Sequence, residues 1–137
     1  MYLNARSIVN KILRVECATV KPDIILVTET FGRKDITDAY LVIDGYQMVV
    51  RKDRTDTEGG KCRGLLVYVI EGIPAGEMSI RGADSVIEYC GVSIPWGQGE
   101  ELKLLCVYRP STAPLSVLDR GNTERLVEAL RALRGRW

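Results

Sequence analysis

The first part of the chain shows a helical pattern followed by a strand pattern. Apolar side chains recur at helical spacing over residues 6–19, which predicts a helix with one buried face. A Lys-Pro-Asp segment at 21–23 ends it, because the residue before a proline disfavours helical geometry. The aliphatic run at 24–27 is short and rich in β-branched residues, which predicts a strand buried on both faces.

The middle of the chain has the pattern of a hairpin. One helical turn is expected at 35–39, followed by a strand at 46–52 that is entered through an Asp-Gly turn. A polar loop at 53–61, which contains two adjacent glycines, separates this strand from a second segment of strand composition at 64–70. The two strands are therefore expected to pair, with a long tip between them.

The last third predicts two strands and a helix. Residues 85–94 and 102–108 have strand composition, and the glycines of the Pro-Trp-Gly-Gln-Gly segment between them permit an antiparallel reversal. Leucine and valine at helical spacing predict an amphipathic helix within 122–133. Helices and strands in this order indicate an α/β protein, and without repeats or linkers the whole chain, 1–137, reads as a single domain.

Composition narrows the classes of function. The chain is 46% hydrophobic, enough for a core, and its formal charge is +1, so that any contact with nucleic acid must be local. Its four cysteines are widely spaced, unlike those of a zinc or redox motif, and are expected to be mostly reduced core residues. With no run of the length of a membrane span and no signal pattern, we expect an intracellular protein, cytoplasmic or nuclear. Histidine is absent, which removes the commonest general base.

Polar side chains stand at the ends of three predicted strands, where ligands commonly meet α/β sheets. Asn4 ends a strand stub at 2–4, Glu29 follows the buried strand, and Tyr108 closes the last strand. An amide oxygen and a carboxylate suit a hard cation such as Mg²⁺, and a tyrosine hydroxyl suits a phosphate oxygen.

Each of the three residues also has a purely structural interpretation. Asn4 fits the first turn of a helix, Glu29 fits an exposed carboxylate that caps a loop, and Tyr108 fits an amphipathic aromatic at a sheet edge. Taken singly, the structural interpretation is favoured for Asn4 and slightly for Tyr108, and the two interpretations are even for Glu29.

One stretch of the chain is clearly basic. It surrounds the paired glycines of the predicted hairpin tip, which would let the backbone approach a nucleic-acid strand closely, although such runs are more often solvated tips. The candidates for nucleic-acid contact are Arg51, Arg54, Lys61 and Arg63, together with Arg109 beside Tyr108.

Five short motifs, taken in order, resemble the endonuclease/exonuclease/phosphatase family. They are Asn-Ala-Arg-Ser at 4–7, Pro-Asp-Ile-Ile with Thr-Glu-Thr at 22–30, Arg-Lys-Asp-Arg at 51–54, Gly-Gly at 59–60 and Val-Tyr-Arg-Pro at 107–110. Their forms are most similar to the endonuclease domains of non-LTR retrotransposon reverse transcriptase polyproteins.

The resemblance implies a fold, a reaction and a set of roles. The family fold is a four-layered, DNase I-like α/β sandwich that holds a divalent metal at one edge, and its enzymes break a phosphodiester through in-line attack of an activated water. The complete form of this chain would nick DNA with Mg²⁺ or Mn²⁺. Carried over by motif, Glu29 would be a metal ligand, Asn4 would help to position the metal or the phosphate, and Tyr108 would contact the phosphate. The rest of a reverse transcriptase polyprotein is an expected partner.

The resemblance covers only the first part of the family domain. The family continues into a Gly-Asp-x-Asn motif and a Ser-Asp-His motif, and neither occurs in this sequence. We therefore expect a domain truncated on its C-terminal side that does not cut DNA alone. Two alternatives stay open: a non-catalytic nucleic-acid or protein binding module of the same fold, and a decayed remnant.

Overall fold

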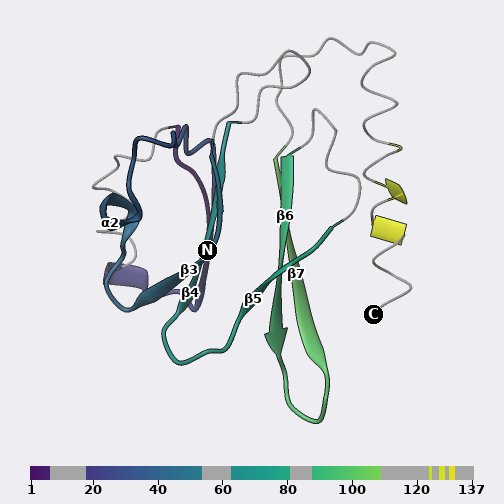
Figure 1. Cartoon of the computed structure of the whole chain (residues 1–137). Coiled ribbons are helices and arrows are strands. Elements are labelled where there is room, and N and C mark those ends of the chain that lie inside the picture. Colours follow the sequence, from purple (N-terminus) through teal and green to yellow (C-terminus); the bar gives the residue numbers. More distant parts are fainter. Residues whose placement is uncertain are drawn as a thin grey trace.

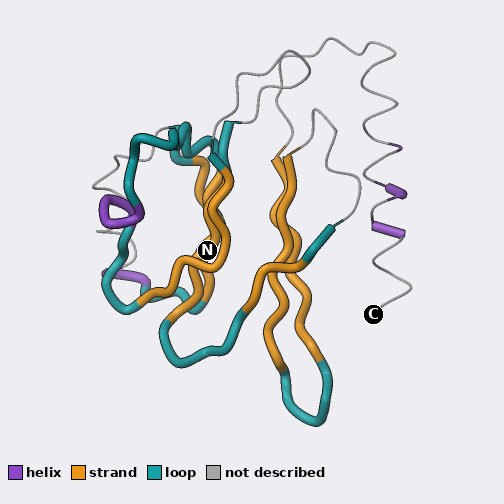
Figure 2. The backbone as a smooth tube through the Cα atoms, in the orientation of Figure 1, coloured by secondary structure: helices purple, strands orange, loops and turns teal. Residues whose placement is uncertain are grey.

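The computed structural model describes residues 1–6, 18–53, 63–80 and 88–108, with five helical residues between 124 and 131. These ranges form two β-sheets that lie against each other (Figures 1 and 2). The first sheet has the strand order β1-β2-β4-β3, and the second has the order β5-β6-β7. The elements are β1 Tyr2–Asn4, β2 Ile24–Thr28, α2 Asp38–Leu41, β3 Tyr46–Lys52, β4 Leu65–Ile70, β5 Gly76–Met78, β6 Glu88–Pro95 and β7 Glu101–Tyr108.

The first sheet confirms the strands expected from the hydrophobic pattern. β1 is the expected stub and runs parallel to β2, with Asn4 opposite Thr28. β2 contains the aliphatic run at 24–27, and β3 pairs antiparallel with β4 as the hairpin pattern predicts. The Asp-Gly turn before β3 places Gly45 at a φ of 82°, a left-handed conformation that glycine adopts without strain. Residues 54–62 of the expected tip lie outside the described residues.

The first sheet is apolar on both faces, because alternate side chains of β4 point to opposite sides. One face packs beneath α2, and the other packs against the second sheet. Burial of each such side chain stabilises the fold by about 1.5–3 kcal/mol relative to exposure. The core on the α2 side contains Ala5, Ile25, Val27, Leu41, Ile43, Leu66 and Tyr68. The core between the sheets contains Val50, Leu65, Val67, Val69, Cys90, Val92, Ile94, Cys106 and Tyr108.

The second sheet is built on the expected antiparallel pair. β6 and β7 pair from Glu88 opposite Tyr108 at one end to Pro95 opposite Glu101 at the other. The reversal between them is closed by a hydrogen bond from the Trp96 N–H to the Glu100 carbonyl, 2.8 Å long. Cys90 and Cys106 face each other across the pair as buried, reduced thiols, as expected of core cysteines. The hydrogen bond with Cys106 and burial both raise the pKa of the Cys90 thiol.

The helical turn expected at 35–39 lies further along the chain. Thr37 is still extended, with φ −74° and ψ 155°, so that α2 begins at Asp38 and continues to Leu41. Of the helix expected over 6–19, residues 18–20 are described and are helical, and Arg6 has a left-handed φ of 51°. Residues 7–17, and most of the helix expected within 122–133, lie outside the described residues.

β5 was not expected from the sequence, because its three residues carry no alternating pattern. It pairs with β6 where Gly91 leaves room for a neighbour. A Cβ at Gly91 would lie 2.9 Å from the side chain of Ile80. The close approach therefore depends on a glycine within the partner strand.

These observations define a mixed α/β protein with two sheets, in which strands outnumber helices among the described residues. In the same part of the chain, no helix is both long and apolar enough to cross a membrane.

Candidate functional site

The three polar residues that end predicted strands meet at one edge of the two sheets. β1 and β2 run parallel, so that Asn4 and Glu29 arrive at the same edge of the first sheet. β4 runs the opposite way and begins there at Leu65, two residues after Arg63. β7 of the second sheet ends at this edge with Tyr108, opposite Glu88 at the start of β6. The side chains of Glu29 and Tyr108 hydrogen-bond to each other and so join the sheets.

A local distortion places Glu29 at this junction. Thr28 is opposite Leu65 in the ladder, but the next hydrogen bond joins the N–H of Thr30 to the carbonyl of Gly64, so that the register shifts by one residue. Glu29 is the extra residue, with a left-handed φ of 53°. This arrangement has the character of a β-bulge, a feature that re-aims a side chain at the end of a strand.

The carboxylate of Glu29 is enclosed by hydrogen-bond donors. Tyr108 donates its hydroxyl to Oε1, and Nη1 of Arg63 lies 2.9 Å from the same oxygen. The same Nη1 is 3.3 Å from the Tyr108 hydroxyl oxygen, and Asn4 adds a side-chain hydrogen bond to the carboxylate. Glu29 is only 9% exposed, so the interpretation of this residue as an exposed capping carboxylate is wrong.

The site keeps Glu29 ionised and Tyr108 protonated near neutral pH. The hydrogen bond from Tyr108 lowers the pKa of Glu29; burial opposes this, and the hydrogen bond and charge of Arg63, with the hydrogen bond of Asn4, lower the pKa further. Burial and the contact with ionised Glu29 raise the pKa of Tyr108 to about 12. The phenol is therefore a stable hydrogen-bond donor, and the carboxylate is a stable acceptor.

A second buried carboxylate holds the backbone of the same site. Glu88 accepts hydrogen bonds from the N–H groups of Arg63 and, at 3.0 Å, Gly64. Gly64 has a φ of 95°, and a Cβ there would collide with the Thr30 hydroxyl, so this position requires glycine. Sequence reasoning missed Glu88, although a signal was present: it is the only charged residue in the strand expected at 85–94.

The described residues do not by themselves fit a divalent cation. Mg²⁺ prefers six oxygen ligands, but Glu88 is committed to two backbone N–H groups and Glu29 already has Arg63 as its counter-charge. No group of three or more His, Cys, Asp or Glu side chains with the arrangement of a metal site occurs in the described ranges. Asn4 and Glu29 are oxygen ligands of a suitable kind, but a complete site would need more of them.

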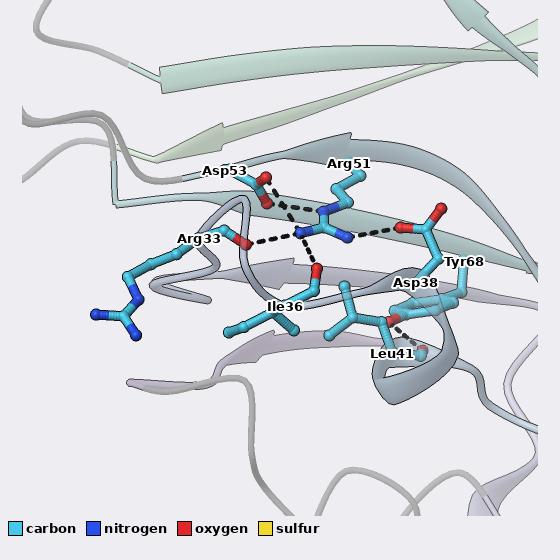
Figure 3. Close-up of polar contacts among 7 residues, drawn as sticks. All are labelled: Arg33, Ile36, Asp38, Leu41, Arg51, Asp53 and Tyr68. Atoms are coloured by element: carbon cyan, nitrogen blue, oxygen red, sulfur yellow. Dashed lines mark hydrogen bonds and ion pairs between the residues drawn. The ribbon is translucent and has the colours of Figure 1, made fainter.

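Arg51, a candidate for nucleic-acid contact, is occupied by internal contacts (Figure 3). Its guanidinium donates to the carboxylates of Asp53 and Asp38 at 2.8 and 2.6 Å, and to the carbonyls of Arg33 and Ile36 at 3.0 and 2.7 Å. The two carboxylates raise the pKa of Arg51, with the hydrogen bond to Asp53 as the largest cause. These contacts tie the loop before α2 to β3 and leave little of the guanidinium for a phosphate.

The other basic candidates divide into two groups. Arg63 lies within the site described above, and its side chain is 30% exposed. Arg54, Lys61 and Arg109 lie outside the described residues.

Comparison of the sequence with protein-family models and with curated proteins gives no match.

Proposed function

We propose that this chain is part of a metal-dependent phosphodiesterase domain of the endonuclease/exonuclease/phosphatase family, of the kind found in the DNA-nicking endonucleases of non-LTR retrotransposons. One observation carries the proposal. Asn4, Glu29 and Tyr108, which the motifs single out at widely separated positions, share one hydrogen-bonded site at the junction of two sheets. Strands that ended at different edges would have left these residues apart.

The architecture supports the same assignment at a coarser level. Two sheets packed through an apolar core, with α2 on the outer face of the first, are what the inner layers of a four-layered DNase I-like sandwich require. The family's site lies at one edge of the paired sheets, as the cluster around Glu29 does here.

Each residue in the site has a protonation state that suits its proposed role. Glu29 is kept ionised and would serve as an oxygen ligand to Mg²⁺ or Mn²⁺, with Asn4 beside it. Tyr108 is kept protonated, so its hydroxyl can donate to a phosphate oxygen. A metal bound in the complete domain would supply positive charge that offsets the negative charge developed on the phosphate oxygens.

This chain lacks the means to complete the reaction. It contains no histidine and no Gly-Asp-x-Asn motif, so it offers no evident base to activate water. General-base catalysis alone contributes about 10²–10⁴-fold. We therefore expect no measurable nicking of DNA by these 137 residues alone.

The second candidate is a non-catalytic module of the same fold that binds nucleic acid or protein. The Arg63–Glu29 ion pair favours it, because a carboxylate that is balanced internally has less need of a metal. A DNA-binding titration at several salt concentrations tests this candidate, because the logarithm of the binding constant falls linearly with log[salt] when a protein contacts phosphates.

A nicking assay on supercoiled plasmid tests the first candidate. The short chain should be inactive, and a chain extended with the family's C-terminal motifs should nick DNA in an EDTA-sensitive manner. In the extended protein, Glu29→Gln should lower the rate by at least about a hundredfold, because it removes a charge from the metal site and preserves shape. Glu71→Gln, at an exposed turn of the same sheet, is the matched control and should be active.

Two results would contradict the proposal. One is robust, EDTA-sensitive nicking by the short chain. The other is full activity of Glu29→Gln in the extended protein.

A further inference from the structure

Arg63 and Gly64, the two residues before β4, connect the two sheets at the edge where Glu29 lies. Their N–H groups both donate to the carboxylate of Glu88, the first residue of β6. The two residues that follow Glu29 donate their own N–H groups to the carbonyls of Gly64 and Arg63, at 3.3 and 2.7 Å. The carboxylate of Glu88 is therefore linked, through the backbone of these two residues, to the chain directly after Glu29.

This contact uses both oxygens of the Glu88 carboxylate. Oε1 accepts from Arg63, Oε2 accepts from Gly64 at 3.0 Å, and Glu88 is buried. A carboxylate can accept at both oxygens, whereas an amide has one acceptor group and one donor group. Hydrogen bonds to a charged acceptor are also stronger than those between neutral groups. The position therefore favours a carboxylate over the amide of the same shape.

Contacts at Glu88 also place two donors to the Glu29 carboxylate. Because the N–H and the carbonyl of Arg63 are both held, its side chain starts from a defined point, and Nη1 lies 2.9 Å from Oε1 of Glu29. Tyr108, which donates to the same oxygen, lies opposite Glu88 in the ladder of β6 and β7. Glu88 thus fixes one donor through a backbone hydrogen bond and the other through strand pairing.

We propose that Glu88 is a positioning residue for the Glu29 carboxylate. From the second sheet it fixes the backbone at Arg63 and Gly64, and that backbone holds both the chain after Glu29 and the guanidinium that contacts it. Glu88 acts through this geometry, because its negative charge alone would have the opposite effect on a neighbouring carboxylate. The inference rests on the proposed function only in treating Glu29 as a functional residue.

A ¹³C NMR titration of the Glu29 carboxyl carbon in the full chain separates position from charge. In Glu88→Gln, the amide leaves one backbone N–H without an acceptor, so the contacts at Glu29 should loosen. We expect the pKa of Glu29 to rise, because the hydrogen bonds from Tyr108 and Arg63 that lower it weaken while burial persists. Loss of the Glu88 charge alone would lower the pKa of Glu29 instead, so the two explanations predict opposite signs.

Two further variants complete the comparison. Glu88→Asp keeps the charge and shortens the side chain by a methylene, so it should also raise the pKa of Glu29. Glu101→Gln is the matched control: it removes the same charge from an exposed side chain at the far end of the β6 and β7 pair, and the pKa of Glu29 should not change.

A pKa of Glu29 that is unchanged or lower in Glu88→Gln would overturn the proposal. If the variants fail to fold, amide hydrogen exchange in the unmodified chain decides. The N–H groups of Arg63 and Gly64 should exchange at least about tenfold more slowly than in an unfolded peptide, and unprotected N–H groups would show that Glu88 does not hold them. None of these measurements involves DNA, so the nicking assay tests the proposed function separately.

Discussion

At the scale of single residues, the chemistry of the site depends on one tyrosine hydroxyl. The hydroxyl of Tyr108 donates a hydrogen bond to Glu29, and the two residues are 79 positions apart in the sequence. A hydrogen bond to a charged partner contributes roughly 1.5–3 kcal/mol to stability, more than one between neutral groups. Tyr108 therefore has two roles: it is a hydrogen-bond donor in the site, and it joins the second sheet to the first.

Tyr108→Phe should destabilise the protein by about 1–3 kcal/mol at neutral pH, measured by urea denaturation, because Glu29 loses a donor while it stays buried. Tyr40→Phe, at a side chain that is 75% exposed, should change stability by less than about 0.5 kcal/mol. Equal effects of the two substitutions would contradict the structure of the site.

The stability difference between the unmodified chain and Tyr108→Phe should also depend on pH. The pKa of Tyr108 is raised to about 12 in the folded state, so its protonated phenol stabilises the fold fully below the ordinary tyrosine value. That contribution is lost as the pH rises through about 12. The difference in the free energy of unfolding between the unmodified chain and Tyr108→Phe should therefore become smaller as the pH rises from the ordinary tyrosine pKa to the raised one. A difference that stays constant over this range would count against the raised pKa.

At the scale of elements, Arg51 holds the loop before α2 against the end of β3. Its guanidinium reaches two carboxylates and two carbonyls, and the side chain is 18% exposed. At the last residue of α2, the Tyr68 hydroxyl donates to the carbonyl of Leu41 at 2.8 Å (Figure 3). The short helix α2 is thus fixed at both ends by side chains from the first sheet.

Arg51→Met should loosen this loop, because two backbone carbonyls and the half-buried Asp53 lose a charged donor. We expect the free energy of unfolding in urea to fall by about 1–3 kcal/mol. Amide hydrogen exchange at 33–41 should become faster than in the unmodified chain, and exchange in β6 and β7 should change less. Arg33→Met, in the exposed Arg33–Asp35 pair of the same loop, should cost less than about 0.5 kcal/mol. Unchanged exchange in Arg51→Met would show that the contacts do not hold the loop.

The limits of sequence reasoning are also clear at this scale. β2, β3 and the pair of β6 and β7 were predictable, because aliphatic runs and glycine turns encode them locally. α2 was displaced because Thr37 stays extended, and β5 carries too few residues for a pattern. The sequence predicts Arg51 as a contact for nucleic acid. Its structural role follows from the ion pair with Asp38, which is distant in the sequence.

At the scale of the whole molecule, the site exists because two sheets end at one junction. The strand ends of Asn4, Glu29 and Tyr108 were identifiable from the sequence, but their meeting depends on how the two sheets pack. The contacts of Arg63 and Glu88 span 34 and 25 residues, so no local pattern predicts them. Sequence reasoning found the residues that end strands and missed those that hold them in place.

The proposed function depends on one feature of the molecule: Glu29 and Tyr108, brought from different sheets, form one site. The most direct measurement is a ¹³C NMR titration of the Glu29 carboxyl carbon in the unmodified chain and in Tyr108→Phe. We predict that the pKa of Glu29 lies below the ordinary glutamate range, and that it rises in Tyr108→Phe because the largest cause of the lowered value is removed. A Glu29 carboxyl that titrates in the ordinary range in both proteins would contradict the account.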